Sequence, residues 1–358
     1  MAGAVVGFRL PNYLDRANAP RYHFHFISKN KDVGGHVLEC QTQDVKTEND
    51  YTVQWHTILP GDDPFYKDAF FQVVQIVIQT KLRSSMSLLT IDQGKCSQDG
   101  LCAADCPMGI IRFEGKGHYP EVLPESELMC IRCGHCVAVC PQGALDHLDV
   151  PLAACTVIDK SLTISPAQTE QFLRSRRSVR QFKDKPVEKA TLQQLISTAR
   201  YAPTASNLQL VEWLVIDDPQ RLHLIATQVI DWMRSLLQDP KATMMPYYPM
   251  LVKAWDAGVD TILRSAPCLV TAMAPGPASV RMIDLTLALS YLELAAPQYG
   301  LGTCWAGLLQ GAMLANPSLK QAVGIPQEYP FHFPLMIGYS KVRYYRLPER
   351  KPPIIHWR

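Results

Sequence analysis

Apolar residues recur every three or four positions over much of the chain after residue 166, which is the spacing of helices that bury one face. Short, uninterrupted apolar runs lie between these stretches and indicate buried strands. The expected helices are 191–202, 219–238 and 284–300, and the expected strands are 213–217, 268–274 and 333–339. We therefore expect a mostly helical region with buried strands inside it.

The first part of the chain, roughly residues 1–82, has a different pattern. Residues 21–28 (RYHFHFIS) alternate and are rich in aromatic side chains, 29–35 suit a turn, and 35–40 resume an extended pattern. These features predict β structure. The most apolar window, 69–80, is interrupted by three glutamines and is shorter than the about 20 apolar residues that span a bilayer.

The composition indicates a folded protein without a nucleic-acid or membrane partner. The 358 residues are 47% hydrophobic and 19% charged, which excludes global disorder. The 35 Lys and Arg against 33 Asp and Glu leave a net charge of +2, too little to attract nucleic acid or an anionic membrane. The N-terminus lacks a basic leader followed by an apolar stretch, so we expect a cytoplasmic protein.

The eleven cysteines are distributed unevenly. An odd number does not suit a secreted disulfide scaffold, and seven of the eleven lie between positions 96 and 140. Residues 96–111 align without a gap on residues 130–145, and seven of the sixteen positions are identical. This middle segment therefore contains two copies of one small unit.

The second copy has the spacing Cys-x2-Cys-x2-Cys-x3-Cys-Pro, which binds a 4Fe-4S cluster. Three thiolates on a tight loop reach three corners of one cluster, and the fourth, ahead of a proline that redirects the chain, reaches the other cluster. Zinc sites also use paired short spacings, but seven cysteines with two Cys-Pro pairs favour iron–sulfur clusters. One cluster is expected on Cys106, Cys130, Cys133 and Cys136, and the other on Cys96, Cys102 and Cys140.

The first copy departs from this pattern at Asp99, which stands where the second copy has Cys133. Two alternatives follow for the second cluster: either the Asp99 carboxylate binds the fourth iron, or that iron is absent and the cluster is 3Fe-4S. A third alternative is that Asp99 and Gly100 only form a turn. We favour the ligand, because Asp99 occupies a ligand position of the repeat.

Residues 86–150 resemble bacterial two-cluster ferredoxin domains. The resemblance implies one-electron transfer at low potential, to or from whatever the rest of the chain binds.

A basic cluster opens the C-terminal region within residues 171–182 (QFLRSRRSVRQF). Guanidinium groups and a hydroxyl at the start of a helix are the combination that binds a phosphate. When these residues are considered alone, a solvated basic face explains them better than a phosphate site. Three further segments decide between the two: 199–209 (ARYAPTASNLQ), 300–307 (GLGTCWAG) and 337–350.

Together these segments make residues 166–358 resemble the nitroreductase family. The family's R-R-S-x-R opening matches Arg176, Arg177, Ser178 and Arg180, and its A-P-S-x-x-N-x-Q stretch matches Ala202 to Gln209 with Thr204 for the serine. The resemblance implies an α+β fold that dimerises and holds FMN at the subunit interface. By this resemblance the cofactor-binding residues are Arg176, Arg177, Ser178, Arg180 and Arg346 near the phosphate, and Pro203, Thr204, Asn207, Cys304, Trp305 and Gly307 beside the isoalloxazine.

Two departures from the family lie near the expected flavin. The usual Q-P-W is Gln209-Leu210-Val211, and the proline that often follows the GY pair is Ser340. Cys304 is expected to be a buried thiol rather than a nucleophile. No G-x-G-x-x-G opens a strand-to-helix turn, so NAD(P)H is expected at most as a transient donor over the flavin.

Three histidines stand out in the first region. His23 and His25 share one face of an alternating strand, and His36 follows across a short turn, which together suit zinc or a similar divalent metal. A strand that carries histidines without a metal is the alternative. Residues 1–82 resemble the C-terminal part of α-acetolactate decarboxylase, whose metal-binding histidines match these three, but the family's N-terminal half is missing. We therefore expect no decarboxylase activity. Three alternatives follow for this segment: a relic of gene fusion, a regulatory metal module, or an extension translated ahead of a start at Met86.

Three domains are thus expected, at 1–82, 86–150 and 166–358, and two classes of function. The first is an FMN oxidoreductase whose clusters exchange electrons with the flavin and which reduces a nitro compound, a quinone or an activated double bond. Its donor is an external ferredoxin or NAD(P)H, and its catalytic acid is unknown. The second is an electron-transfer or redox-sensing module without a small-molecule substrate.

Overall fold

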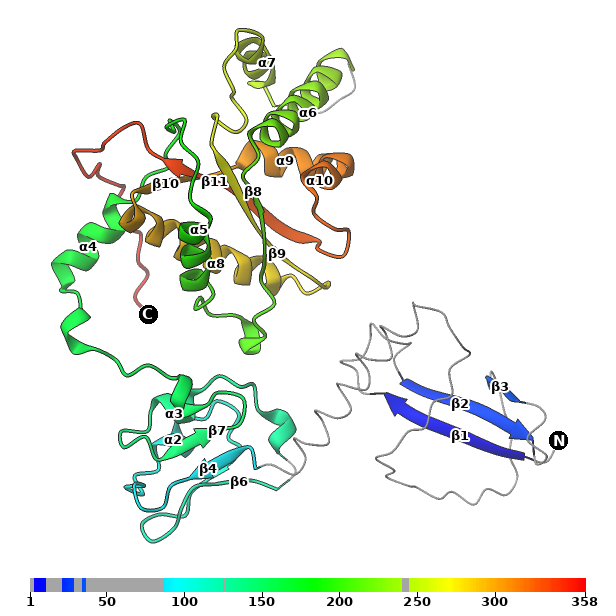
Figure 1. Ribbon diagram of the computed structural model, residues 1–358, viewed down its shortest axis with the longest axis vertical. Coiled ribbons are helices and arrows are strands. Elements are labelled where there is room, and N and C mark those ends of the chain that lie inside the picture. The colour runs from blue at the N-terminus through cyan, green and yellow to red at the C-terminus, as the bar shows by residue number, and fades with distance from the viewer. Residues whose placement is uncertain (1–2, 11–20, 29–33, 37–86, 125, 240–244) are drawn as a thin grey trace. The chain divides into compact units, whose positions relative to one another are not determined.

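The computed structural model describes residues 3–10, 21–28 and 34–36 as backbone strands, and residues 87–124, 126–239 and 245–358 with their side chains. The chain divides into two compact units, Met1–Ser85 and Met86–Arg358 (Figure 1). Within the described ranges, no helix combines the length and the apolar character needed to cross a membrane. The ten cysteines in these ranges are free thiols.

The first unit contains an antiparallel sheet in the order β1-β2-β3. Its strands are β1 (Gly3–Leu10), β2 (Arg21–Ser28) and β3 (Gly34–His36). The β structure predicted for residues 21–28 is therefore confirmed. The apolar window 69–80 lies outside the described residues.

The cysteine-rich part of the second unit consists of short elements on two small sheets. Strand β4 pairs antiparallel with β7, and β5 pairs antiparallel with β6. The elements are β4 (Leu89–Ile91), α2 (Leu101–Ala104), β5 (Ile111–Arg112), β6 (Glu121–Val122), η2 (Glu127–Met129), α3 (His135–Ala138) and β7 (Leu145–His147). Leu88, Ile110, Val137 and Leu145 form their core together with cysteine side chains.

The remainder of the second unit is built on a four-stranded antiparallel sheet in the order β10-β11-β9-β8. Its strands are β8 (Glu212–Ile216), β9 (Cys268–Ala274), β10 (Leu301–Trp305) and β11 (Phe331–Tyr339). Three of them confirm the strands predicted from apolar runs. Strand β10 was not predicted as a strand.

Helices cover both faces of this sheet (Figure 1). Neighbouring residues of β9 point to opposite faces, so that Leu269 packs with α6, α7, α9 and α10, while Val270 packs with α5 and α8. The helices are η3 (Leu152–Ala154), η4 (Lys160–Leu162), α4 (Pro166–Ser175), α5 (Lys189–Ala199), η5 (Ala205–Asn207), α6 (Pro219–Gln238), α7 (Tyr248–Asp256), α8 (Val280–Ala295), η6 (Ala296–Tyr299), α9 (Gly307–Ala315) and α10 (Pro317–Val323). The three predicted helices correspond to α5, α6 and α8 with η6.

Candidate functional site

The duplicated cysteine unit is visible in the backbone. Gln98 and Arg132, at equivalent positions of the two copies, have φ angles of 53° and 54°. The equivalent glycines Gly100 and Gly134 both have φ 73° and ψ 4°, and each directly precedes a short helix. Left-handed backbone at these positions turns each loop tightly enough to gather its cysteines. The predicted repeat is therefore confirmed.

The cysteines surround two separate cavities, and each cavity draws on both copies of the repeat. The first is lined by Cys130, Cys133 and Cys136 of the second copy and by Cys106 of the first. The second is lined by Cys96 and Cys102 of the first copy and by Cys140 of the second. This is the crossed arrangement that the spacing predicts. The cysteines of each set are too far apart to bind one metal ion together. In the ranges with described side chains, no three His, Cys, Asp or Glu could hold a single metal ion.

Asp99 lies in the wall of the second cavity, beside Cys96, Cys102 and Cys140. Its Oδ1 accepts the Leu101 N–H at 3.0 Å, and its Oδ2 accepts the Ser97 hydroxyl at 2.8 Å. These hydrogen bonds lower the pKa of the Asp99 carboxyl, the Leu101 amide most. The carboxylate thus makes the turn that begins α2, and its remaining lone pairs still leave it able to bind a metal.

Hydrogen bonds reach the sulfurs of the first cavity. The Arg132 N–H donates to Cys130 Sγ at 3.4 Å, and His147 Nε2 lies 3.3 Å from the same sulfur. His147 Nδ1 accepts the N–H groups of Asp149 and Val150, so the ring proton is on Nε2 and points at the sulfur. Burial raises the pKa of Cys136 to about 11, so iron must displace a proton there. Such contacts set the potential of an iron–sulfur cluster.

The predicted basic segment, residues 171–182, begins in the last turns of a helix and continues beyond it, so the expected helix start is wrong. Helix α4 begins earlier, because Ser165 and Gln168 form a capping box, and it ends at Ser175. The next residues are extended: the Val179 N–H donates to Thr303 O at 2.8 Å, and the Lys183 N–H donates to Tyr339 O at 2.7 Å. The segment thus runs beside the middle of β10 and reaches the end of β11.

A glycine in β10 allows this close approach. A Cβ atom built on Gly302 would overlap the Val179 side chain. The motif glycine before Thr303 and Cys304 is therefore required for packing of the basic segment.

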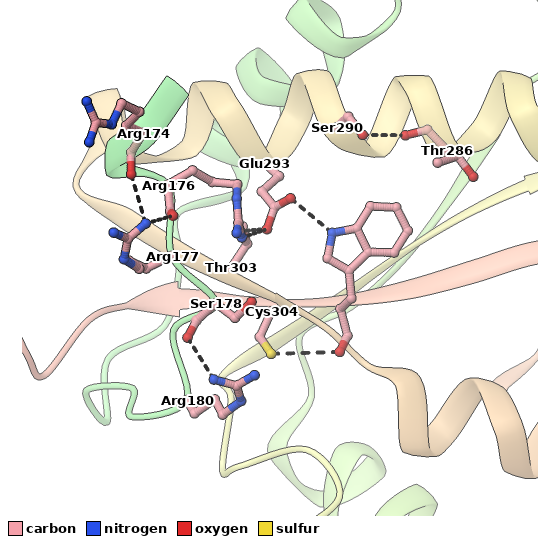
Figure 2. A network of polar contacts seen from close by, with 11 residues as sticks. Arg174, Arg176, Arg177, Ser178, Arg180, Thr286, Ser290, Glu293, Thr303 and Cys304 are labelled. Carbon is pink, nitrogen blue, oxygen red and sulfur yellow. Dashed lines mark hydrogen bonds and ion pairs between the residues drawn. The ribbon is translucent and has the colours of Figure 1, made fainter. Parts of the chain in front are cut away.

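The three arginines that follow α4 in this segment differ in their partners (Figure 2). Arg176 Nη1 forms an ion pair with Glu293 Oε1 at 3.1 Å. Arg177 Nη1 donates to the carbonyls of Arg174 and Arg176 at 2.8 and 2.7 Å. Arg180 makes a 3.4 Å contact with the Ser178 carbonyl, and its side chain is exposed. Arg180 is thus the one of the three whose guanidinium is exposed and can donate to a bound anion.

Glu293 connects the basic segment to the GLGTCW strand. Its side chain is 8% exposed and accepts the Trp305 Nε1–H at 3.0 Å as well as the Arg176 guanidinium. Thr303 Oγ1 lies 3.5 Å from the same carboxylate (Figure 2). Sequence reasoning missed Glu293, although a signal was present: Asp284 and Glu293 are the two charged residues of the apolar stretch 284–300.

Cys304 and Arg346 lie at the two edges of the same region. Burial raises the pKa of the Cys304 thiol, which favours a packing residue over a nucleophile. Arg346 is exposed in the segment after β11. An ion pair of 3.2 Å between Arg174 and Glu349 brings that segment to the end of α4, and Arg346 lies three residues before Glu349.

The predicted residues Pro203, Thr204 and Asn207 belong to a loop at the other end of α8. The Ala205 N–H donates to Asp284 Oδ1 at 2.9 Å. Asp284 and Glu293 are nine residues apart, which is about 13 Å along a helix. One chain therefore holds the basic segment and this loop at separate positions along α8.

The three N-terminal histidines are placed by strand register alone. His25 of β2 pairs with His36 of β3, and His23 lies two positions along β2. Two positions along a strand return to the same face, so the register is compatible with the predicted metal site.

Comparison with known families identifies three parts of the chain. The model of the nitroreductase family matches residues 173–339, and the model of the 4Fe-4S dicluster domain matches residues 95–145. Residues 173–339 are a nitroreductase domain. The model of alpha-acetolactate decarboxylase matches residues 1–72. The three predicted resemblances are therefore confirmed, and an α+β nitroreductase fold follows for the region built on the four-stranded sheet.

The curated relatives match segments outside the nitroreductase domain. Alpha-acetolactate decarboxylase of Methanosarcina mazei is 37% identical over 75 residues, which are 21% of this chain and 26% of that protein. Polyferredoxin protein MvhB of Methanothermus fervidus is 31% identical over 87 residues, which are 24% of this chain and 19% of that protein. The chain thus spans about a quarter or less of the length of these relatives.

Solved structures resemble the nitroreductase domain. An FMN-dependent nitroreductase from Clostridium difficile R20291 is 26% identical with a TM-score of 0.37, covering 49% of this chain and 89% of that one. A nitroreductase with bound FMN from Bacteroides fragilis NCTC 9343 is 16% identical with a TM-score of 0.44, covering 53% and 99%. A nitroreductase domain joined to a 4Fe-4S domain supports flavin and iron–sulfur redox activity.

Glu293→Gln tests whether the buried carboxylate holds the basic segment. The amide keeps the shape but leaves the half-buried Arg176 guanidinium without its counter-charge, which should lower the free energy of unfolding by about 2 kcal/mol. The denaturation midpoint, followed by tryptophan fluorescence, measures the loss. Glu170→Gln is the matched control, since Glu170 is 63% exposed and its pair with Arg174 should contribute less than about 0.5 kcal/mol. Equal midpoints for the two variants would contradict the role given to Glu293.

Proposed function

We propose that the protein is an FMN-dependent oxidoreductase in which two iron–sulfur clusters exchange electrons with the flavin. The observation that carries the proposal is the pair of crossed cysteine cavities in the same compact unit as the nitroreductase domain. Bound FMN accepts electrons one at a time from a cluster and delivers two together to an organic acceptor. The acceptor would be a nitro compound, a quinone or an activated double bond.

The residues of the basic segment suit the FMN phosphate. Arg180 and Ser178 would bind its oxygens, and Arg346 would approach from the segment after β11. Arg176 is neutralised by Glu293 and instead fixes the backbone on which Ser178 is carried. Charge-assisted hydrogen bonds from a guanidinium fork are the usual means of holding such a group.

A second copy of the chain would complete the flavin site. The resemblance to nitroreductases assigns the isoalloxazine border to both the loop at Thr204 and the strand at Cys304. In one chain these two segments are fixed to different ends of α8, through Asp284 and through Glu293. A homodimer that brings the loop of one protomer to the strand of its partner would satisfy both assignments.

Anaerobically purified protein titrated with NADPH and then with dithionite tests this function. The visible spectrum should contain both flavin and cluster absorbance, and dithionite should bleach both. Turnover of a nitroaromatic or a quinone with reduced ferredoxin or NADPH is the expected activity. Flavin reduction without turnover of any small acceptor would favour an electron-relay or sensing module, and the absence of flavin from a protein supplied with FMN would refute the proposal.

Asp99→Cys tests whether Asp99 binds iron. The thiolate should convert the second cluster into an ordinary 4Fe-4S cluster, which changes the EPR spectrum of the reduced protein. Asp99→Ser is the control, because the serine hydroxyl can also accept the Leu101 N–H in this turn but adds no thiolate. Identical EPR spectra for the original protein and Asp99→Cys would show that Asp99 only forms the turn.

The N-terminal segment is proposed to bind a divalent metal through His23, His25 and His36, without decarboxylase activity. Metal analysis of the protein and of a variant with both His23→Gln and His25→Gln should differ by one metal ion, since each substitution removes an imidazole ligand. Acetolactate should give no acetoin above background. Acetoin formation that the histidine variant abolishes would overturn the second half of this expectation.

A further inference from the structure

The side chain of Asn207 joins the loop of the nitroreductase domain to the loop of the first cysteine cavity. Asn207 Nδ2 donates to Ile131 O at 3.1 Å and to Arg132 O at 2.9 Å. These two carbonyls lie between Cys130 and Cys133, which both line the cavity. One carboxamide thus uses both of its N–H donors on the peptide groups between two cluster ligands.

The nitroreductase side of this contact is held in an unusual conformation. Ser206, Asn207 and Gln209 have φ angles of 51°, 53° and 51°, a left-handed region that non-glycine residues rarely occupy. Such a backbone persists where surrounding contacts hold it. Here Asp284 accepts the Ala205 N–H, and Thr204 Oγ1 accepts the Gln209 N–H at 3.0 Å.

The anchor of this loop is buried. Asp284 is 3% exposed and forms an ion pair of 3.1 Å with Arg281 on the same helix, α8. A buried, paired carboxylate cannot move without losing its partners, so it fixes the position of the Ala205 N–H. The direction in which Asn207 points is therefore set by the nitroreductase domain itself.

The cluster side of the contact is equally constrained. Arg132 is left-handed, and its Nε lies 3.1 Å from Asp149 Oδ2. The N–H of Arg132 donates to Cys130 Sγ, while its carbonyl accepts from Asn207. One residue therefore touches a cluster sulfur with its amide and the flavin-side loop with its carbonyl.

We propose that Asn207 docks the cluster loop 130–133 on the flavin site, and that electrons pass between the two domains at the cavity of Cys106, Cys130, Cys133 and Cys136. This inference rests on the proposed function. A reduced protein of the ferredoxin class would supply two electrons, one at a time, through the second cavity, and the first cavity would pass both on to bound FMN. With protons from water these two electrons would reduce the acceptor, so that two ferredoxins would be oxidised for each acceptor reduced by two electrons.

The two cysteine loops, 96–99 and 130–133, differ in what binds them, and this difference supports entry of electrons at the second cavity and exit at the first. Residues 131 and 132 have equivalents at 97 and 98 in the first copy of the repeat. Gln98 Oε1 accepts the Gly117 N–H, so this loop bonds within its own domain. The loop of the second cavity thus forms this hydrogen bond within the cysteine-rich domain, whereas the loop of the first cavity accepts hydrogen bonds from the nitroreductase domain.

Asn207→Asp in the full-length protein tests the docking. A carboxylate has no N–H to donate and repels the two carbonyls. We expect amide hydrogen exchange at residues 131–133 to accelerate about tenfold, because two hydrogen bonds are lost. The exchange is measured on flavin-free protein with its clusters in place. There, substitution of a residue that only contacts FMN would leave the exchange rate unchanged. With FMN restored to saturation, stopped-flow transfer from clusters to flavin should slow about tenfold as well.

Asn316→Asp provides a matched control. It makes the same change of one amide to a carboxylate at the start of α10, where Asn316 Oδ1 accepts the Ser318 N–H at 3.1 Å and aspartate caps equally well. Neither exchange at 131–133 nor electron transfer should change in this variant. If Asn207→Asp does not fold, Asn207→Ser removes both amide donors without adding charge.

Unchanged exchange at residues 131–133 in flavin-free Asn207→Asp, or in Asn207→Ser, would overturn the docking role. Faster exchange with unaltered cluster-to-flavin transfer would overturn the assignment of the first cavity as the exit. Failure of the proposed function has a different signature, namely an original protein that lacks flavin or turns over no acceptor. The exchange experiment still gives its answer in that case, because it needs no flavin.

Discussion

Two buried carboxylates on α8 constrain both irregular segments of the nitroreductase domain. Removing a carboxylate from water is costly unless it is paired and hydrogen-bonded, so each must keep its partners. Glu293 forms an ion pair with Arg176 and accepts a hydrogen bond from the Trp305 indole. Asp284 forms an ion pair with Arg281 and accepts a hydrogen bond from the Ala205 N–H. The basic segment and the 203–209 loop have little regular structure of their own. Their positions therefore follow from the charges of one helix.

The helix can meet this demand because both carboxylates stand at buried positions, although Ile283 and Tyr291 of the same helix are exposed. It packs on the sheet together with α5 and carries Leu285, Leu289 and Leu292 in the core. Asp284 and Glu293 therefore each meet a neighbouring segment. Nine residues correspond to about half a rotation beyond two full turns, so Asp284 and Glu293 point to different neighbours.

The parts of the site that depend on local spacing could be predicted from the sequence. The cysteine spacing and the 34-residue repeat determine which residues line each cavity, because tight loops leave few arrangements for neighbouring thiols. Strand β10 is difficult to predict from the sequence, since Thr303 is the single β-branched residue among its five. The helix start expected at the basic cluster is wrong because the capping box that begins α4 stands at Ser165, eleven residues before Arg176.

Contacts between distant segments could not be predicted from local patterns. Asn207 matches a family motif, which explains its expected place beside a flavin, but nothing in that motif points to residue 132. The two are 75 positions apart and meet only when both domains are folded. A single asparagine can serve both purposes, since its carboxamide offers two donors to the cluster loop and retains its oxygen for another partner. A place beside the flavin is therefore compatible with a second role for Asn207, which is to bind the cluster loop through Ile131 O and Arg132 O.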